Sequence, residues 1–338
     1  MRAAVYYSND DVRIEDRPVP GIGPGEALLR IEASGICGSD VLEWYRRARA
    51  PLVLGHEVAG IVEEVGEGVA SIRPGDRVVA SHHVPCNTCR HCLAGHETLC
   101  DTLRTTSFDP GGFAERVRLP AINVDRGVYP MPDAMSFETA TFTEPLACVL
   151  RAQRIAAMPP GHRVLVLGSG LAGLLHVAAA PIFGAGFVAA TDLVPERREA
   201  AGRLGAAPFG ADGDLPRFLG ERGGLADLVI VCAAAPGIFD QALACVERGG
   251  TILLFALPEP GTVHPMPMHD IWRNSIRIIA SYAGNRADHM AALSILAAGR
   301  IDVSSLVTHR LPLDRTAEGF RLVAEGRRAL KVIIEPQR

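Results

Sequence analysis

The stretch HRVLVLGSGLAGLLHVAAA, residues 162–180, predicts the fold of the central part of the chain. Its first half, RVLVLG, is a short apolar run of the kind that forms a buried strand. Gly168, Gly170 and Gly173 follow with the spacing G-x-G-x-x-G, and an apolar helix is expected to begin there. Strand, glycine turn and helix in this order predict a dinucleotide-binding unit.

The residues of this turn have distinct expected roles. Gly168 allows the tight turn, Gly170 lets a pyrophosphate approach the backbone, and Gly173 lets the helix pack closely on the strand. The phosphates would bind at the helix N-terminus, where free N–H groups and the helix dipole favour an anion. We therefore predict that Gly168, Gly170, Leu171, Ala172 and Gly173 bind the cofactor.

A second predicted strand, FVAATD, ends at Asp192, nineteen residues after Gly173. A carboxylate at this position binds the adenosine ribose hydroxyls and repels a 2′-phosphate, which predicts NAD rather than NADP. Arg197 and Arg198 weaken this prediction, because an arginine can accept a 2′-phosphate. The pair could instead be a solvated helix face, with Arg197 covering the adenine.

The rest of the chain predicts two domains of different composition. The stretches ADLVIVCAAA, GGTILLFALP and SIRIIASYAG alternate with helical segments, which indicates an α/β domain with a doubly wound parallel sheet over residues 151–285. Residues 1–150 are rich in glycine, proline and short strands and predict a β-rich domain. Residues 286–338 contain a helix and a final strand, and we expect them to return to the first domain.

Length and charge exclude several classes of partner. The 338 residues carry 34 − 38 = −4 net charge without a lysine or arginine run, so nothing favours a nucleic acid. The start of the sequence lacks the pattern of a signal peptide. The longest apolar region is interrupted by Pro181 and three glycines, which argues against a membrane span. We expect a cytoplasmic protein, in which thiols stay reduced.

Half of the eight cysteines lie in CNTCRHCLAGHETLC, residues 86–100. A reducing compartment, and the close spacing of these cysteines, disfavour disulfides. An iron–sulfur cluster is also disfavoured, because its fourth ligand usually comes from elsewhere in the chain. Incidental surface thiols are also disfavoured, because exposed free cysteines are reactive. The spacing C-x2-C-x2-C-x7-C therefore predicts a closed structural zinc site formed by Cys86, Cys89, Cys92 and Cys100.

A second metal site is predicted from separate segments. Cys37 lies in GICGSD, His56 and Glu57 lie in LGHEVAG, and Glu144 lies in FTEPLACV. Each residue alone is a weak signal, but together they offer a thiolate, an imidazole and one or two carboxylates, a set that Zn²⁺ accepts. Asp40 either accepts the second ring N–H of His56 or caps a loop.

These motifs together resemble one known family. GHEVAGIVEEVGEGV fits the signature G-H-E-x2-G-x5-G-x2-V, and CGSD, the four-cysteine lobe, GGFAE, EPLA and the glycine turn occur in the same order as in the zinc-dependent medium-chain dehydrogenases. The sequence is most similar to the polyol (sorbitol) and threonine dehydrogenase branch. The resemblance implies a GroES-like catalytic domain, a Rossmann domain, an active site in the cleft between them, and a homotetramer or homodimer.

The resemblance also implies roles for single residues. Cys37 and His56 would bind the catalytic zinc, and Glu57 would bind it or lie next to its ligands. Glu144 would bind zinc directly or through water, and Ser39 would accept the substrate proton. His83 would lie near the substrate, or His82 and His83 would be polar residues at a strand end.

Other positions depart from the family or allow two interpretations. Lys331 is expected either near the cofactor phosphate or as an exposed strand residue. Leu42 stands where many relatives have a proton-relay histidine, and Gly284 and Asn285 stand where sorbitol dehydrogenases have an arginine–tyrosine pair. The basic loop with Arg46, Arg47 and Arg49 would line the pocket mouth and favour an acidic or phosphorylated polyol, or form a solvated face. The second interpretation is favoured.

The sequence thus predicts an enzyme with two zinc ions and NAD. It would interconvert a secondary alcohol, of polyol, cyclitol or sugar-acid type, and its ketone by hydride transfer. A threonine 3-dehydrogenase-like or simple secondary-alcohol dehydrogenase is an alternative. A zinc-free quinone or enoyl reductase and a non-enzymatic nucleotide-binding protein are the rival classes. The first usually lacks both the Cys-His-Glu set and the four-cysteine lobe. Ser39 beside a full ligand set argues against the second.

Overall fold

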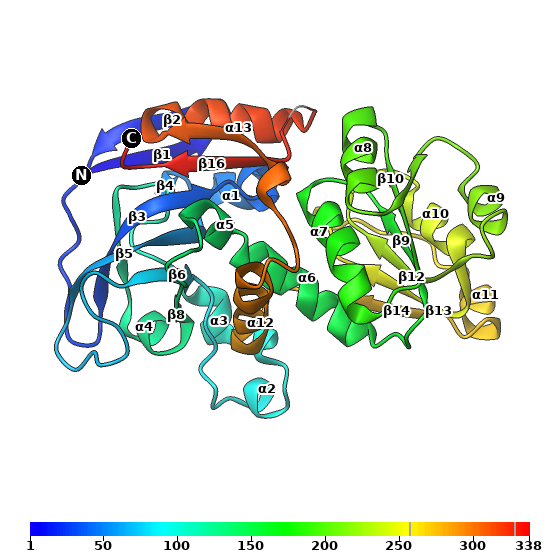
Figure 1. Cartoon of the computed structure of the whole chain (residues 1–338), viewed down its shortest axis with the longest axis horizontal. Helices are drawn as coiled ribbons and strands as arrows, with labels where there is room; N and C mark the ends of the chain where they lie inside the picture. Colours follow the sequence, from blue (N-terminus) through cyan, green and yellow to red (C-terminus); the bar gives the residue numbers. More distant parts are fainter. Residues whose placement is uncertain (257, 328) are drawn as a thin grey trace. The chain divides into compact units, whose positions relative to one another are not determined.

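The computed structural model describes residues 1–256, 258–327 and 329–338. The chain divides into two units (Figure 1): unit 1 comprises Met1–Ala147 and Ala283–Arg338, and unit 2 comprises Cys148–Tyr282. Each change of unit lies three residues before the boundary expected from the sequence. Leu257, in the predicted strand GGTILLFALP, and Arg328, in the C-terminal segment, lie outside the described residues.

The strands of both units are short. They are β1 (Arg2–Ser8), β2 (Asp11–Asp16), β3 (Ala27–Gly35), β4 (Leu52–Val53), β5 (Glu57–Val65), β6 (Arg77–Ser81), β7 (Arg116–Leu119), β8 (Val128–Pro130), β9 (Arg163–Leu167), β10 (Phe187–Asp192), β11 (Ala207–Gly210), β12 (Ala226–Val231), β13 (Val246–Leu254), β14 (Arg277–Ala280), β15 (Val307–Pro312) and β16 (Lys331–Glu335).

Helices connect these strands. The α-helices are α1 (Glu43–Arg46), α2 (Arg90–Leu93), α3 (Asp101–Thr105), α4 (Ala121–Gly127), α5 (Phe137–Thr141), α6 (Thr143–Ala156), α7 (Leu171–Ala179), α8 (Pro195–Arg203), α9 (Leu215–Gly220), α10 (Ile238–Cys245), α11 (Met268–Arg273), α12 (Arg286–Ala297) and α13 (Thr316–Glu325). The 3-10 helices are η1 (Gly38–Val41), η2 (Arg47–Arg49), η3 (Glu97–Leu99), η4 (Ala180–Phe183), η5 (Ser304–Leu306) and η6 (Leu313–Arg315).

Unit 2 is built on a parallel sheet with the strand order β11-β10-β9-β12-β13-β14. Every pair in this sheet is parallel. Taken in chain order, the strands follow the sequence 3-2-1-4-5-6, which is the order of a doubly wound dinucleotide-binding fold. The predicted fold of unit 2 is therefore confirmed.

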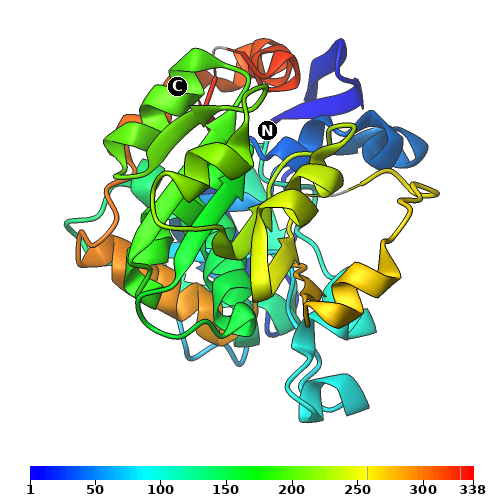
Figure 2. The same cartoon turned by 90° about the vertical axis from the view of Figure 1, so that its right-hand side faces the viewer.

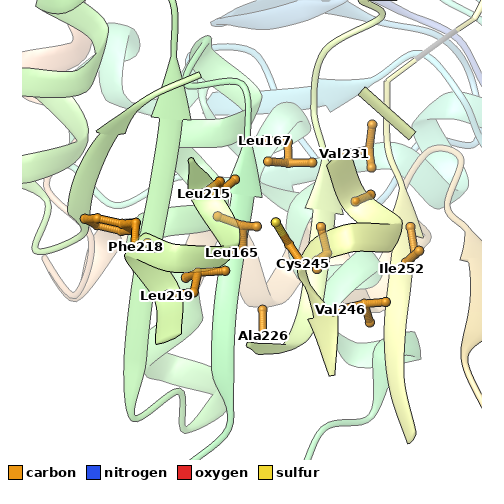
Figure 3. Packing of buried hydrophobic residues seen from close by; sticks show 13 residues of the cluster. Leu165, Leu167, Leu215, Phe218, Leu219, Ala226, Val231, Cys245, Val246 and Ile252 are labelled. Atoms are coloured by element: carbon orange, nitrogen blue, oxygen red, sulfur yellow. The ribbon is translucent and has the colours of Figure 1, made fainter. Parts of the chain in front are cut away.

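Helices cover both faces of this sheet. Leu165 and Leu167 of β9 pack in one apolar cluster with side chains of α9 and α10, such as Phe218 and Cys245 (Figure 3). Helix α7 lies against the opposite face. Side chains alternate along a strand, so Val166 points away from the face that carries Leu165 and Leu167. A Cβ on Gly173 of α7 would approach the Val166 side chain. The buried cluster fixes the strand ends from which the nucleotide turn begins.

Unit 1 contains a small sheet, β2-β1-β4, and a larger one with the order β15-β16-β3-β5-β6-β8, in which β7 also pairs with β3. Strand β16 is antiparallel to β3 and parallel to β15, so the C-terminal segment belongs to unit 1. Residues 86–100 form a lobe around α2 that projects from unit 1 in both views (Figures 1 and 2). No helix within the described residues is long and apolar enough to cross a membrane.

Candidate metal centres and nucleotide site

The pairing of β3 with β5 brings the first ligand set together. The antiparallel register places Gly35 opposite Glu57, so Cys37 follows the end of one strand while His56 precedes the start of its neighbour. One ligand atom from each of Cys37, His56 and Glu57 lies within 4.8 Å of the others. Glu144 is half-buried in the first turn of α6 and does not belong to this group among the described residues.

The short helix η1 fixes Cys37 and orients His56. Cys37 caps η1: its Sγ accepts a hydrogen bond from Ser39 N at 3.5 Å, and Asp40 Oδ2 accepts one from Cys37 N at 3.0 Å. Asp40 is fully buried, and its Oδ1 lies 3.4 Å from His56 Nδ1. Since Asp40 engages Nδ1, Nε2 of His56 is the nitrogen left to bind a metal.

The donor set of this site fits a divalent metal. Burial lowers the pKa of His56, but Asp40 and Cys37 outweigh it and hold the pKa well above its usual value. A proton is thus retained where a cation would bind, and a bound ion would displace it. Glu57 Oε1 is buried and has no hydrogen-bond partner within the described chain. A thiolate, an imidazole and a carboxylate suit Zn²⁺.

Lys331 occupies an unexpected position beside this set. Its side chain is 0% exposed, and its Nζ forms an ion pair with Glu57 Oε2. The Lys331 Nζ also lies 3.5 Å from Ile36 O, next to Cys37 in the chain. The expectation of an exposed strand residue is therefore wrong: β16 is an inner strand of the larger sheet, and its first side chain points toward Glu57. A place near the cofactor phosphate stays a prediction.

Four imidazoles of unit 1, those of His56, His82, His83 and His289, are close enough to affect one another's charge. The ring centroids of His56 and His82 are 4.7 Å apart, and those of His82 and His83 are 3.7 Å apart. Burial and the neighbouring charge of His56 lower the pKa of His83 to about 3. Burial also lowers the pKa of His82, and the nearby imidazoles add to this effect. Both rings are therefore neutral groups that can serve as hydrogen-bond donors or acceptors.

His289 is the fourth of these imidazoles, and no motif in the sequence points to it. It is 2% exposed on α12 and stacks on Tyr129, with ring centroids 5.6 Å apart. Its Nδ1 lies 2.8 Å from Asn285 O, and its Nε2 is buried without a partner among the described residues. The pairing of β8 with β6 places Tyr129 opposite Val79, close to the strand end that His82 and His83 follow, and this register cannot be read from the sequence.

The basic loop has a different structure from the favoured expectation. Arg47 and Arg49 are exposed, as in a solvated face. The Arg46 side chain, however, is only 13% exposed and donates hydrogen bonds to Ser39 O at 3.0 Å and Ser39 Oγ at 3.1 Å. The expectation is therefore wrong for Arg46.

The four sulfurs of the lobe are arranged to hold a tetrahedral ion. The four cysteines are free thiols whose sulfurs lie within 4.8 Å of one another. Cys92 Sγ is 3.6 Å from Cys89 Sγ and 4.0 Å from Cys86 Sγ. A tetrahedron with zinc–sulfur bonds of about 2.3 Å has edges of about 3.8 Å, close to both separations.

The electrostatics of the lobe also favour a cation. Hydrogen bonds from the hydroxyl and N–H of Thr88 and from Cys89 N lower the pKa of Cys86 to about 5. Burial raises the pKa of Cys92, as does the neighbouring thiol of Cys89. Crowded sulfurs that cannot all ionise by themselves can do so around a divalent ion.

Replacement of Cys89 by serine is expected to remove one zinc ion per chain and to lower the melting temperature by about 5–10 °C, as a loss of a few kcal/mol would. Zinc content and thermal unfolding, measured together, check this result. Leu93→Ser is the matched control, because Leu93 lies in the same lobe and is 77% exposed. Unchanged zinc content and melting temperature in Cys89→Ser would contradict a structural ion in the lobe.

The glycine turn of unit 2 has the geometry of a phosphate cradle. Gly168 has φ +97°, and a Cβ on Gly173 would lie 1.9 Å from Gly168 O, so neither position accepts a side chain without strain. A Cβ on Gly170 would have as its nearest neighbour Arg197 Nη1 at 3.8 Å, which leaves room above that residue. Gly170 is the N-cap of α7 and has no side chain to satisfy the first N–H groups of the helix. Leu171 and Ala172 form the first turn of α7. These features suit a bound pyrophosphate.

Asp192 lies at the end of β10, beside this turn. Its Oδ2 accepts a hydrogen bond from Ser169 N, and its Oδ1 accepts one from Val194 N, both at 2.9 Å. Arg197 Nη1 lies 3.7 Å from Asp192 Oδ2, and Arg198 donates to Asp192 O at 2.9 Å. The carboxylate is therefore fixed where the ribose of a bound nucleotide is expected, with a guanidinium next to it.

Comparison with known proteins shows what this chain is similar to. Residues 23–133 match the family "Alcohol dehydrogenase GroES-like domain", and residues 172–298 match "Zinc-binding dehydrogenase". Sorbitol dehydrogenase of Bacillus subtilis (strain 168) is 33% identical over 356 residues, covering 100% of this chain and 98% of that protein.

Two solved structures show the same likeness. The structure of alcohol dehydrogenase TADH from Thermus sp. ATN1 aligns with a TM-score of 0.88 and 30% identity, covering 99% of each chain. The structure of a short chain alcohol dehydrogenase from E. coli CFT073, complexed with NADH, aligns with a TM-score of 0.89 and 27% identity, again covering 99% of each chain.

The fold, the two ligand sets and these likenesses define the class of the protein. The chain belongs to the zinc-dependent medium-chain dehydrogenases, in the sorbitol (polyol) dehydrogenase branch. It is an oxidoreductase with a GroES-like unit and a Rossmann unit. The predicted family and fold class are thereby confirmed.

Proposed function

We propose that the protein is a zinc-dependent NAD(H) dehydrogenase that interconverts a secondary alcohol of polyol, cyclitol or sugar-acid type and its ketone. The observation that carries the proposal is the convergence of Cys37, His56 and Glu57 within 4.8 Å, with Ser39 two residues from Cys37. The names of relatives such as sorbitol dehydrogenase and alcohol dehydrogenase support the same substrate class.

The residues of unit 1 would have different roles in catalysis. Cys37 and His56 would hold the catalytic ion, Glu57 would bind it or lie next to its ligands, and Glu144 would bind it directly or through water. When bound, zinc supplies Lewis acidity that lowers the pKa of an alcohol, and the nicotinamide supplies the hydride acceptor. Ser39 Oγ accepts the substrate proton.

Asp40 has a supporting role in this arrangement. Its carboxylate lies 3.4 Å from His56 Nδ1 and keeps that nitrogen protonated, so that the other ring nitrogen would be available to bind the ion. Leu42 has no proton to transfer, so the proton leaves Ser39 by another route, such as the ribose hydroxyl and water. Neutral His82 and His83 are suited to hydrogen bonds with the hydroxyls of a polyol.

In unit 2, Gly168, Gly170, Leu171, Ala172 and Gly173 would bind the pyrophosphate of the dinucleotide. Asp192 would bind the ribose, and Arg197 would cover the adenine. The fixed carboxylate of Asp192 favours NAD, whereas Arg197 at 3.7 Å reduces the penalty for a 2′-phosphate. We therefore expect a preference for NAD rather than strict exclusion of NADP. The NADH-bound structure of the E. coli relative supports a nicotinamide cofactor.

The second metal ion, the quaternary structure and the compartment belong to the same proposal. The four sulfurs of the lobe support a structural zinc, which makes two ions per chain. A homotetramer, or else a homodimer, and a cytoplasmic location stay predictions from the sequence.

A substrate panel tests the proposal. Purified, zinc-replete protein is assayed with NAD and with NADP over sorbitol and other polyols, inositols, sugar acids, threonine and 2,3-butanediol. We expect NAD reduction with at least one polyol, cyclitol or sugar acid, at a higher kcat/KM than with threonine or simple alcohols. Activity confined to threonine or simple alcohols would favour those alternatives, and no activity with any alcohol in a zinc-loaded protein would overturn the proposal.

A further inference from the structure

Arg46 donates two hydrogen bonds to Ser39. It is the last residue of α1, and its Nε donates to Ser39 O at 3.0 Å while its Nη2 donates to Ser39 Oγ at 3.1 Å. Two N–H groups of one planar guanidinium thus hold the backbone and the hydroxyl of the same residue. Such a fork fixes an acceptor in direction as well as distance.

The guanidinium is itself held in place. Its Nη2 lies 3.5 Å from Asp40 Oδ1, and its central carbon lies 4.5 Å from the centroid of the Tyr45 ring. With its side chain 13% exposed, Arg46 is closer to a buried residue than to the solvated Arg47 and Arg49 beside it. A fixed, poorly solvated cation therefore lies within hydrogen-bond distance of the hydroxyl proposed to receive the substrate proton.

The chemistry of arginine limits what Arg46 can do. A guanidinium stays positively charged in proteins, so Arg46 neither gives up nor accepts a proton, and any effect must act through Ser39. A hydroxyl oxygen has two lone pairs and one hydrogen. Arg46 takes one lone pair, which leaves the second lone pair to accept the substrate proton and the hydrogen to pass to water. Its positive charge favours any state in which negative charge builds up at neighbouring oxygens.

We propose that Arg46 is a positioning residue for Ser39, an inference that rests on the proposed function. It holds the hydroxyl in the orientation that accepts the substrate proton, and its charge assists the departure of a proton from Ser39 to water. Among the described contacts, no other side chain donates a hydrogen bond to Ser39 Oγ. The side chain of Leu42, four residues before Arg46, is apolar and offers no donor.

Arg46→Gln and Arg46→Lys in the zinc-replete enzyme test this role, with Arg49→Gln as the matched control. Arg49 lies three residues later and faces the same Tyr45 ring at 5.4 Å, but it is exposed. In Arg46→Gln we expect kcat to fall about 10–100-fold and the KM for the alcohol to change less than about threefold, because a proton-transfer step is impaired rather than binding. Arg46→Lys, which keeps the charge, should be intermediate, and Arg49→Gln should stay within about twofold of the parent.

Two further measurements separate positioning from a structural role. The solvent deuterium isotope effect on kcat should rise in Arg46→Gln, because the proton step becomes slower relative to hydride transfer. A crystal structure of this variant should show Ser39 Oγ in more than one rotamer, with Cys37 and His56 unmoved. Zinc content and melting temperature should match the parent protein. If Arg46→Gln does not fold, Arg46→Lys carries both measurements.

The outcomes distinguish this proposal from the proposed function. An active parent enzyme with an equally active Arg46→Gln variant overturns the role of Arg46 alone. An equal loss in Arg49→Gln, or a loss that comes with lost zinc and an unchanged isotope effect, also overturns it. A parent protein that oxidises no alcohol overturns the proposed function, and the role of Arg46 with it.

Discussion

Replacement of Cys37 or His56 by alanine is expected to lower kcat/KM for the alcohol at least about a thousandfold, because Lewis-acid stabilisation of the developing charge is worth several kcal/mol. The affinity for NADH should change by less than about threefold, since the proposed nucleotide contacts lie in the glycine turn and not in the ligand set. Initial-rate kinetics and nicotinamide fluorescence titration give the two numbers.

A matched control separates loss of the metal ligand from loss of a histidine in general. His309 lies on β15 of the same unit, and its ring nitrogen bonds to the exposed hydroxyl of Thr308. His309→Ala should keep parental kinetics. If His56→Ala remained fully active without bound zinc, the assignment of the catalytic site would be wrong.

Replacement of Lys331 by methionine is expected to lower the free energy of unfolding by about 3–5 kcal/mol, because it leaves the Glu57 carboxylate buried without its counterion. Both side chains are 0% exposed, so solvent does not screen the pair. Denaturant unfolding, followed by a probe in unit 1, measures the loss.

A double variant identifies the cause of this loss. In Lys331→Met with Glu57→Gln the buried charge is removed together with its partner, and most of the stability should return. A loss of less than about 0.5 kcal/mol in the single variant, the size expected for a surface change, would refute the importance of the ion pair.

Much of the fold could be predicted from the sequence because local patterns and connectivity coincide in unit 2. Strands β9, β10, β12, β13 and β14 correspond to apolar runs that alternate with helices. Strand β11 was missed: its four residues include Pro208, and it lies at the edge of the sheet, where a strand needs neither an apolar run nor a complete set of N–H donors.

The candidate site was predictable only where residues that act together share a motif. The spacing of the four cysteines is local, and His56 and Glu57 are adjacent, so the sequence could name them. Arg46, Lys331 and His289 reach their places through a folded loop, a returning strand and a distant helix. Such contacts depend on register and packing, which periodicity does not encode.

Lys331 is the only lysine among the 338 residues, and every other basic side chain is an arginine or a histidine. Its amine is buried in unit 1, so an amine-reactive reagent has no accessible lysine side chain to modify in the native protein. Acylation of this one nitrogen would therefore record opening of the region around the candidate catalytic centre. A mass shift beyond that of the exposed α-amino group of Met1 would report how often, and how fast, this region opens.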